Sequence, residues 1–210
     1  MNTADNKTKR LTLIRHANAD HDADVRDFER PLSRKGQSEA LEMARRFQER
    51  ALVPDLIITS AATRTRETAE TFAKVLGVPA RLLQADDSLY LAEGDYIVGA
   101  IRAVGPRVGH LMVIGHNPGI SAAAISLAPE AITNDLPTCG TLTMIVSCPT
   151  WNLIDRRCVR ESERAEHSRP LVAWRLRQCR TADRDIDTRG DQLCHRINGG
   201  ELRHCEHWIH

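Results

Sequence analysis

Short apolar runs alternate along the chain with longer segments in which apolar residues recur every three or four positions. Three runs of strand length stop abruptly at polar residues: 11–14, 55–59 and 111–114. Runs without internal alternation are typical of strands buried in a parallel sheet. A weaker strand is expected over 78–83, and the alternating segment 141–147 predicts an edge or final strand.

The three- and four-residue spacing of the intervening segments predicts amphipathic helices. Residues with known preferences for helix ends mark where these helices begin and stop. The expected helices begin after Ser33 and end before Pro54, begin after Ser60 and end at Gly77, span 95–104, and begin at Pro118.

Strands that alternate with helices predict an α/β fold, a three-layer α/β/α sandwich with a mostly parallel sheet. In open sheets of this class, ligands bind just beyond the carboxyl ends of the strands. Three strand ends are followed by Arg15-His16, by Ser60 with Arg64 one helical turn later, and by His116. Two arginines and two histidines are therefore expected in one pocket, beside two helix N-termini that favour an anion.

Composition narrows the classes of partner. Lys and Arg number 29 against 28 Asp and Glu, for a net charge of +1, which argues against binding to nucleic acid. Residues 1–10 are polar, with no apolar segment typical of a secretory signal, and are expected to be disordered. With no apolar run long enough for a membrane span, a cytoplasmic protein is expected. The oligomeric state stays open.

The expected pocket suits a phosphoryl group. Arginine binds two oxygens at once and keeps its charge at any physiological pH. A neutral histidine nitrogen can attack phosphorus, while fixed cations stabilise the transferring group. No cofactor is expected, and no metal, because metal-ligand spacing is missing around 15–20 and 115–119. An Arg-His pair alone is a weak signal, since a second one occurs at Arg203-His204.

Four motifs in order resemble the histidine phosphatase superfamily, and its small SixA-type phosphohistidine phosphatases in particular. They are Leu13-Ile-Arg-His-Ala17, Arg30-Pro-Leu-Ser-Arg-Lys-Gly36, Ser60-Ala-Ala-Thr-Arg-Thr-Arg-Glu-Thr68 and Val113-Ile-Gly-His-Asn-Pro-Gly119, within about residues 10 to 145. The resemblance implies a phosphoglycerate mutase-like fold and a phosphatase with His16 as nucleophile. It also implies Arg15 and Arg64 as phosphate ligands and His116 as the second histidine. Arg30 is either a substrate-binding residue or part of a structural ion pair.

Two positions depart from the pattern of that superfamily. Ala17 stands where the family usually has glycine, so the backbone there must keep a negative φ. Leu89-Tyr90 holds no carboxylate where mutases and acid phosphatases place a general acid. This fits a phosphorylated protein with phosphohistidine as substrate. A small-molecule phosphomonoesterase or mutase, and a non-catalytic phosphate-sensing or protein-binding module, are the alternatives.

The last part of the chain differs in composition, which predicts a phosphatase domain over 11–147 and an atypical tail over 148–210. The tail holds all three tryptophans and five of six cysteines, but no Lys or Phe. It reads as a poorly ordered extension, given its low aliphatic content, as a frameshift product, or as a zinc-binding appendage. The zinc ligands would come from Cys179, Cys194, His195, His204, Cys205 and His207.

Overall fold

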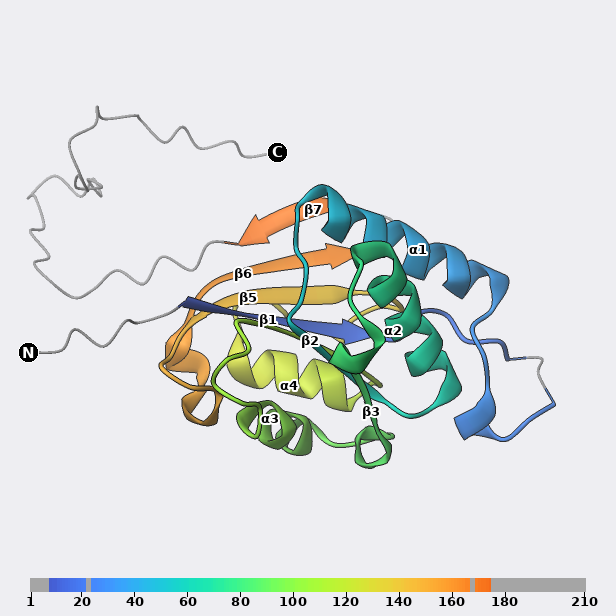
Figure 1. Ribbon diagram of the computed structural model, residues 1–210, viewed down its shortest axis with the longest axis horizontal. Helices are drawn as coiled ribbons and strands as arrows, with labels where there is room; N and C mark the ends of the chain where they lie inside the picture. Colours follow the sequence, from blue (N-terminus) through green and yellow to red (C-terminus); the bar gives the residue numbers. More distant parts are fainter. Residues whose placement is uncertain (1–7, 22–23, 167–168, 175–210) are drawn as a thin grey trace, which may run out of the picture. The chain divides into compact units, whose positions relative to one another are not determined.

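The computed structural model describes residues 8–21, 24–166 and 169–174, which build a seven-stranded sheet (Figure 1). Its spatial order is β3-β2-β4-β1-β5-β6-β7. Neighbours among the first four strands run parallel, whereas each pairing from β1·β5 onward is antiparallel. The strands are β1 (Thr8–Arg15), β2 (Leu56–Ser60), β3 (Leu83–Asp86), β4 (His110–Gly115), β5 (Thr141–Ser147), β6 (Val159–Glu166) and β7 (Arg169–Trp174).

Helices cover both faces of the sheet, α1 and α2 on one and α3 and α4 on the other (Figure 1). The predicted three-layer α/β/α sandwich is therefore confirmed. The α-helices are α1 (Arg34–Glu49), α2 (Thr63–Leu76), α3 (Gly94–Arg102) and α4 (Gly119–Leu127). The 3-10 helices are η1 (Asp27–Glu29), η2 (Ala80–Leu82), η3 (Asp87–Leu89), η4 (Trp151–Leu153) and η5 (Arg156–Cys158).

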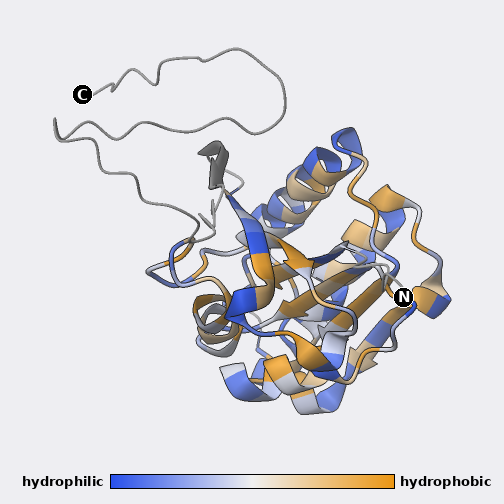
Figure 2. Cartoon of the chain, turned by 90° about the vertical axis from the view of Figure 1, so that its left-hand side faces the viewer, coloured by the Kyte–Doolittle hydropathy of each residue, from blue (hydrophilic) through white to orange (hydrophobic). Residues whose placement is uncertain are grey.

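Each face of the sheet has its own apolar core. Successive side chains of a strand point to opposite faces, so Leu13 packs into the core beneath α3 and α4, whereas Ile14 packs beneath α1 and α2. Both side chains are fully buried. In Figure 2 the central strands are predominantly hydrophobic, and the helices carry hydrophilic residues outward. The continuous apolar runs of the sequence thus reflect burial on two sides.

The loop after β1 is held firmly against α1. Ser33 is the N-cap of α1, as predicted, and its Oγ accepts a hydrogen bond from the Gly36 nitrogen at 3.1 Å. A Cβ at Gly36 would lie only 2.0 Å from the Asn18 carbonyl oxygen. Gly36 therefore permits a close approach of helix and loop two residues beyond His16.

Three predictions about elements were wrong in detail. Ser60 is the last residue of β2 and not a helix cap; the N-cap of α2 is Ala62. The weak strand expected over 78–83 starts only at Leu83, where pairing with β2 begins, and is preceded by the 3-10 turn η2. β5 is an internal strand, paired with β1 on one side and β6 on the other.

The sheet continues past Ser147, where the sequence predicted the domain boundary. Trp151 is fully buried, and its indole nitrogen donates to the Val108 carbonyl at 2.9 Å. β6 then pairs with β5 through an irregular register. Because β6 is rich in charged residues, its sequence lacks the apolar alternation of a strand. The six cysteines and histidines considered as zinc ligands lie outside the described residues.

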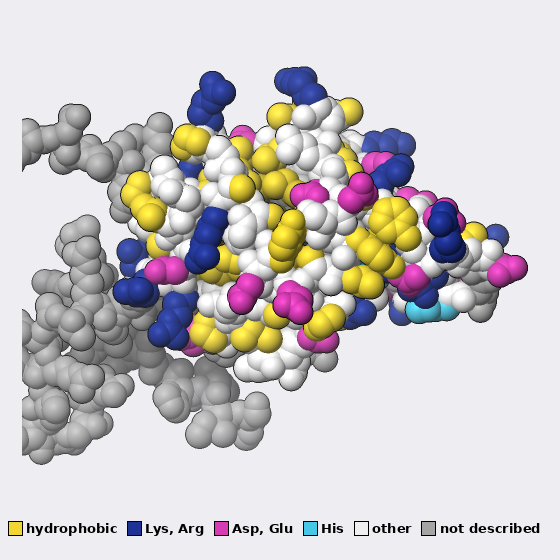
Figure 3. Space-filling view, turned by 90° about the horizontal axis from the view of Figure 1, so that it is seen from below, with side chains coloured by type: hydrophobic (Ala, Val, Ile, Leu, Met, Phe, Trp, Pro, Cys, Tyr) yellow, Lys and Arg dark blue, Asp and Glu magenta, His cyan; other side chains and the backbone are white. Residues whose placement is uncertain are grey.

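The outer face below the sheet, seen in Figure 3, mixes apolar side chains with acidic and basic ones. No single sign of charge dominates that face, in keeping with the net charge of +1. Within the described ranges, no helix is both long enough and apolar enough to cross a membrane.

Candidate active site

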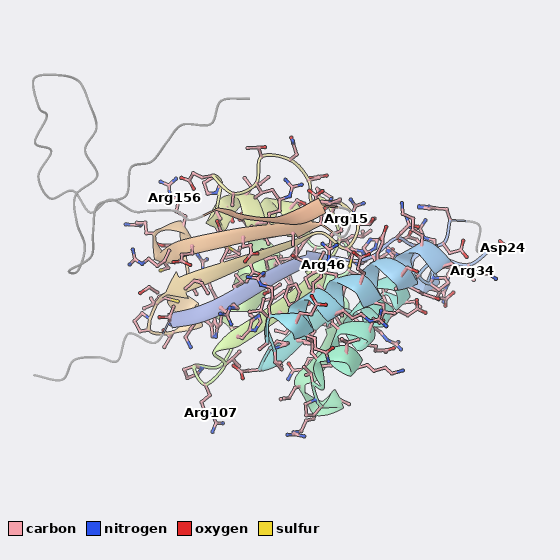
Figure 4. All side chains as sticks on the ribbon, turned by 90° about the horizontal axis from the view of Figure 1, so that it is seen from above. Arg15, Asp24, Arg34, Arg46, Arg107 and Arg156 are labelled. Atoms are coloured by element: carbon pink, nitrogen blue, oxygen red, sulfur yellow. The ribbon has the colours of Figure 1, made fainter. Side chains whose placement is uncertain are left out.

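Three neighbouring strands end at the same edge of the sheet and bring the predicted site residues together. β4 lies between β2 and β1, and Arg15 is in register with Gly115. The His16 nitrogen donates to the Gly115 carbonyl at 3.0 Å, which places the two histidine backbones side by side. Figure 4 shows Arg15 at this edge and Arg107 at the opposite one. The His16 and His116 ring centroids are 5.1 Å apart.

The contacts of His16 define which of its nitrogens is free to react. Nδ1 lies 2.7 Å from the Ala17 carbonyl oxygen, and because a carbonyl only accepts, Nδ1 carries the proton. In the neutral ring Nε2 then has a lone pair. Burial, reinforced by the charges of Arg64 and Arg15, lowers the pKa of His16 to about 4, although the bond to Ala17 opposes this shift. At neutral pH the ring is uncharged.

Arg64 lies in the first turn of α2 and is buried, with 2% of its surface exposed. Its Nε donates to His16 Nε2 at 3.4 Å, and its Nη2 donates to Asp27 Oδ2 at 2.9 Å. The hydroxyl of Thr68, one turn further along α2, accepts from the Ala17 nitrogen at 3.2 Å. The same helix thus presents a cation to the imidazole and fixes the backbone beside it.

His116 follows β4 and is also buried, with 2% exposed. Its Nε2 shares a hydrogen bond with Ser60 Oγ at 2.9 Å, whereas its Nδ1 has no hydrogen-bond partner within the part of the chain that the structure describes. Burial, and then the neighbouring His16 and Arg64, lower its pKa to about 3. His116 is therefore a neutral ring with one buried nitrogen that makes no hydrogen bond within the described residues.

The two remaining candidates, Arg15 and Arg30, lie around this pair of histidines. Arg15 Nη1 donates to the Leu136 carbonyl at 2.9 Å, and its charge contributes to the lowered pKa of both histidines. Arg30 pairs with Asp27 at 2.6 Å, which is the structural ion pair considered for it. Its charge also reaches His16. A substrate contact of Arg30 stays a prediction.

The sequence did not single out Asp27 or Tyr90. The Tyr90 hydroxyl donates to Asp27 Oδ2 at 2.6 Å, and the Tyr90 ring packs edge-on against His116, with centroids 5.5 Å apart. Asp27 begins the short 3-10 helix η1 and Tyr90 follows the short 3-10 helix η3, and in both segments no periodicity points to a role. Asp27 is one of several acidic residues in a polar segment, and the aromatic Tyr90 stands where a general acid was sought.

The polar groups at this edge suit an oxyanion. Arg15 and Arg64 supply fixed positive charge, and His16 supplies an uncharged nitrogen with a lone pair. Across the described ranges, no group of three or more His, Cys, Asp or Glu side chains is arranged to hold a metal ion.

Comparison with known proteins gives the family of the chain. Residues 11–87 match the family model of the histidine phosphatase superfamily (branch 1). An uncharacterised chloroplastic protein of Arabidopsis thaliana is 31% identical over 153 residues, which cover 69% of each chain. The chain belongs to the histidine phosphatase superfamily. As a histidine phosphatase, it is an enzyme that hydrolyses bonds to phosphoryl groups. A second relative, an uncharacterised protein of Mycobacterium tuberculosis, is 31% identical over 143 residues, which cover 64% of this chain and 87% of its own.

Solved structures extend the similarity of this histidine phosphatase to the fold. A protein of Agrobacterium tumefaciens described as a candidate phosphohistidine phosphatase SixA is 30% identical, with a TM-score of 0.61 over 66% of this chain and 92% of its own. The protein histidine phosphatase SixA complexed with tungstate has a TM-score of 0.59 at 21% identity, over 66% of this chain and 88% of its own. The latter likeness concerns the fold alone.

Proposed function

We propose that this histidine phosphatase hydrolyses phosphohistidine in a protein, through a phosphorylated His16 and without a metal ion. The observation that carries the proposal is the state of His16. Its Nδ1 proton is tied to a carbonyl, its pKa lies well below neutrality, and its Nε2 lone pair faces Arg64. A nucleophile is prepared in this way when its proton and its orientation are both fixed.

The reaction has two displacement steps at phosphorus. In the first, His16 Nε2 attacks the phosphoryl group, a bond from Nε2 to phosphorus forms, and the bond from phosphorus to the substrate nitrogen breaks. In the second, water attacks phospho-His16, inorganic phosphate leaves, and Nε2 regains its lone pair. The substrate imidazole, already protonated on its other nitrogen, leaves in the first step as a neutral ring. In the second step both protons of the water end on the released phosphate, H2PO4⁻, so the atoms and charges balance.

The surrounding cations and His116 have roles that follow from their positions. Arg64 and Arg15 stabilise the negative charge on the transferring oxygens, which is the main contribution of a protein to phosphoryl transfer. His116 can hold a phosphoryl oxygen or receive a proton at Nδ1, because Ser60 occupies only Nε2. Ser60 orients the ring and leaves Nδ1 for the substrate.

Two observations support phosphohistidine over an alkyl ester as the substrate. An alkoxide leaving group needs a proton, whereas imidazole protonated on its second nitrogen leaves neutral. Residues 89 and 90 are Leu and Tyr, so this segment offers no carboxylic acid. The 30% identical structure from Agrobacterium tumefaciens also carries the description of a phosphohistidine phosphatase.

Turnover and labelling of the whole chain test the proposal. With ³²P-labelled phosphoramidate and rapid quenching, the wild type is expected to show acid-labile, base-stable phosphate on His16. His16→Ala is expected to lose this label and about a thousand-fold or more in kcat. Equal label in both proteins would contradict the proposed nucleophile. Phosphoglycerate turnover as fast as that of a phosphohistidine peptide would favour the mutase or small-molecule alternative, and absence of any turnover would favour a binding module.

Two arginines on α2 provide a matched control. Arg64 is buried at His16, whereas Arg66 is exposed and pairs with Glu70 at 3.8 Å. Arg64→Gln is expected to lower kcat/KM by about 100-fold or more, and Arg66→Gln to leave it unchanged. Similar losses in both variants would show that charge on the helix, and not contact with the phosphoryl group, is what matters.

A further inference from the structure

Asp27 holds both terminal nitrogens of Arg64. Its main-chain carbonyl accepts from Nη1 and its carboxylate accepts from Nη2, the latter at 2.9 Å. A guanidinium is planar and rigid, so fixing Nη1 and Nη2 also fixes the direction of Nε. That third nitrogen points at His16 Nε2, 3.4 Å away. The orientation of the cation toward the nucleophile is thus set by one residue of η1.

The same carboxylate reaches the second histidine through Tyr90. Asp27 Oδ2 accepts from the Tyr90 hydroxyl at 2.6 Å, and the Tyr90 ring stands at 89° to the His116 ring. Phe28, the next residue of η1, packs edge-on against the Tyr90 ring, with the two ring centroids 5.0 Å apart. One short turn therefore contacts the partners of both histidines.

The donors around Asp27 determine its charge. Arg64, Arg30 and Tyr90 all donate to or pair with its two oxygens. The hydrogen bond from Tyr90, followed by those from Arg64, holds the pKa of Asp27 below its usual value. A carboxylate in this state accepts hydrogen bonds and has no proton to give at neutral pH.

We propose that Asp27 is a positioning residue for phosphoryl transfer, which aims Arg64 at His16 and holds Tyr90 against His116 without itself transferring a proton. The inference rests on the proposed function, since it assigns Asp27 a part in the same reaction. It distinguishes Asp27 from a general acid, the other role that a carboxylate at this place can have.

The two roles differ in their dependence on the leaving group. Loss of a general acid is felt most by leaving groups that need a proton, so the damage grows with their pKa. Loss of a positioning residue weakens Arg64 equally for every substrate. Removing the Asp27 charge also makes the pocket more positive, which favours phosphate, while the displaced Arg64 disfavours it. We therefore expect a large change in kcat and a small change in phosphate affinity.

The experiment compares Asp27→Ala and Asp27→Asn with Glu29→Gln. Glu29 lies in the same turn, is exposed, and pairs with Arg26 away from the site. Across phosphoramidate and a series of aryl phosphates, Asp27→Ala is expected to lower kcat by about 10- to 100-fold for every leaving group. The inhibition constant of inorganic phosphate should change less than about threefold. Asp27→Asn, which keeps a side-chain oxygen, should lose less, and Glu29→Gln nothing.

A second measurement does not depend on turnover. The Nε proton of Arg64, observed by ¹H–¹⁵N NMR, should be protected from exchange in the wild type, in Glu29→Gln and partly in Asp27→Asn, and lost in Asp27→Ala. An unchanged Arg64 signal, or a loss of kcat that rises with leaving-group pKa, would overturn the inference. This signal is measured without substrate. An inactive wild type would therefore refute the proposed function, whereas the NMR comparison would still test whether Asp27 positions Arg64.

Discussion

Two buried histidines lie at opposite ends of β4 and differ in one respect that matters. His110 begins the strand and His116 follows its last residue. Burial lowers the pKa of both, to about 4 and about 3. Both ring nitrogens of His110 have partners, at 3.0 Å from Thr12 Oγ1 and 3.1 Å from the Val53 carbonyl, whereas His116 has a partner on Nε2 only among the residues that the structure describes.

This comparison shows that burial and a lowered pKa do not by themselves mark a functional histidine. A buried ring with both nitrogens bonded is a completed part of the structure, because no polar atom is left for a ligand. Among the described residues, His116 Nδ1 has no hydrogen-bond partner, and the ring lies 5.1 Å from a second imidazole, an arrangement that suits a role in the reaction. The following predictions test whether that difference separates function from stability.

The largest expected effect is on activity. His116→Gln should lower kcat/KM for phosphoramidate by about 100- to 1000-fold, because a phosphoryl partner is lost. His110→Gln, at the other end of the strand, should stay within about threefold of the wild type at a temperature where both variants are folded. Steady-state kinetics at 15 °C measure this. Comparable losses in the two variants would remove the distinction.

Stability should show the reverse order. His110→Ala leaves the Val53 carbonyl without its side-chain donor and the Thr12 hydroxyl with Thr143 as its remaining side-chain partner, at a cost of about 1 to 3 kcal/mol in the free energy of unfolding. His116→Ala removes a single hydrogen bond and should cost less. Urea unfolding followed by circular dichroism provides the comparison. A larger loss for His116→Ala would mean that the site end of β4 is the more important for folding.

The pH dependence of stability sharpens the same point. The pKa of His110 falls from 6.5 to about 4 on folding. Between these pH values the unfolded chain therefore binds a proton at His110 that the folded chain does not bind. The contribution of His110 to the stability is fully present above about pH 6.5 and is lost as the pH falls toward 4. His110→Gln should reduce this slope in urea titrations at pH 7.5 and pH 5 and leave the part that comes from His16 and His116. An unchanged slope would show that His110 does not account for it.

The smallest expected effects come from the hydroxyl partners. Ser60→Ala frees the His116 ring and should lower kcat/KM by about tenfold, with little change in stability. Thr12→Val removes the hydrogen bonds to His110 and to Thr143 and should cost about 1 kcal/mol in the free energy of unfolding, with activity unchanged. Enzyme assays and urea unfolding of the two variants measure both effects. A loss of activity in Thr12→Val would contradict the assignment of His110 to stability alone.

Residue order was enough to predict the layers and the grouping of His16, Arg64 and His116 at strand ends. Apolar runs and their polar ends follow directly from a sheet buried on both faces. The position of Asp27 was beyond prediction, since a loop without periodicity gives no sign of which of its acidic residues contacts the site. β6 was not predicted for a related reason. It pairs with β5 through backbone hydrogen bonds, while most of its side chains are charged and give no apolar pattern.

The internal position of β5 has a practical consequence for anyone who shortens this protein. A version that stops at Ser147 would bare one side of β5, from Thr141 to Val146, and leave a row of amide and carbonyl groups open to water. Such an exposed edge can pair with strands of other molecules, so the shortened protein is expected to aggregate. If the chain ends no earlier than Glu166, β6 is retained and continues to pair with β5.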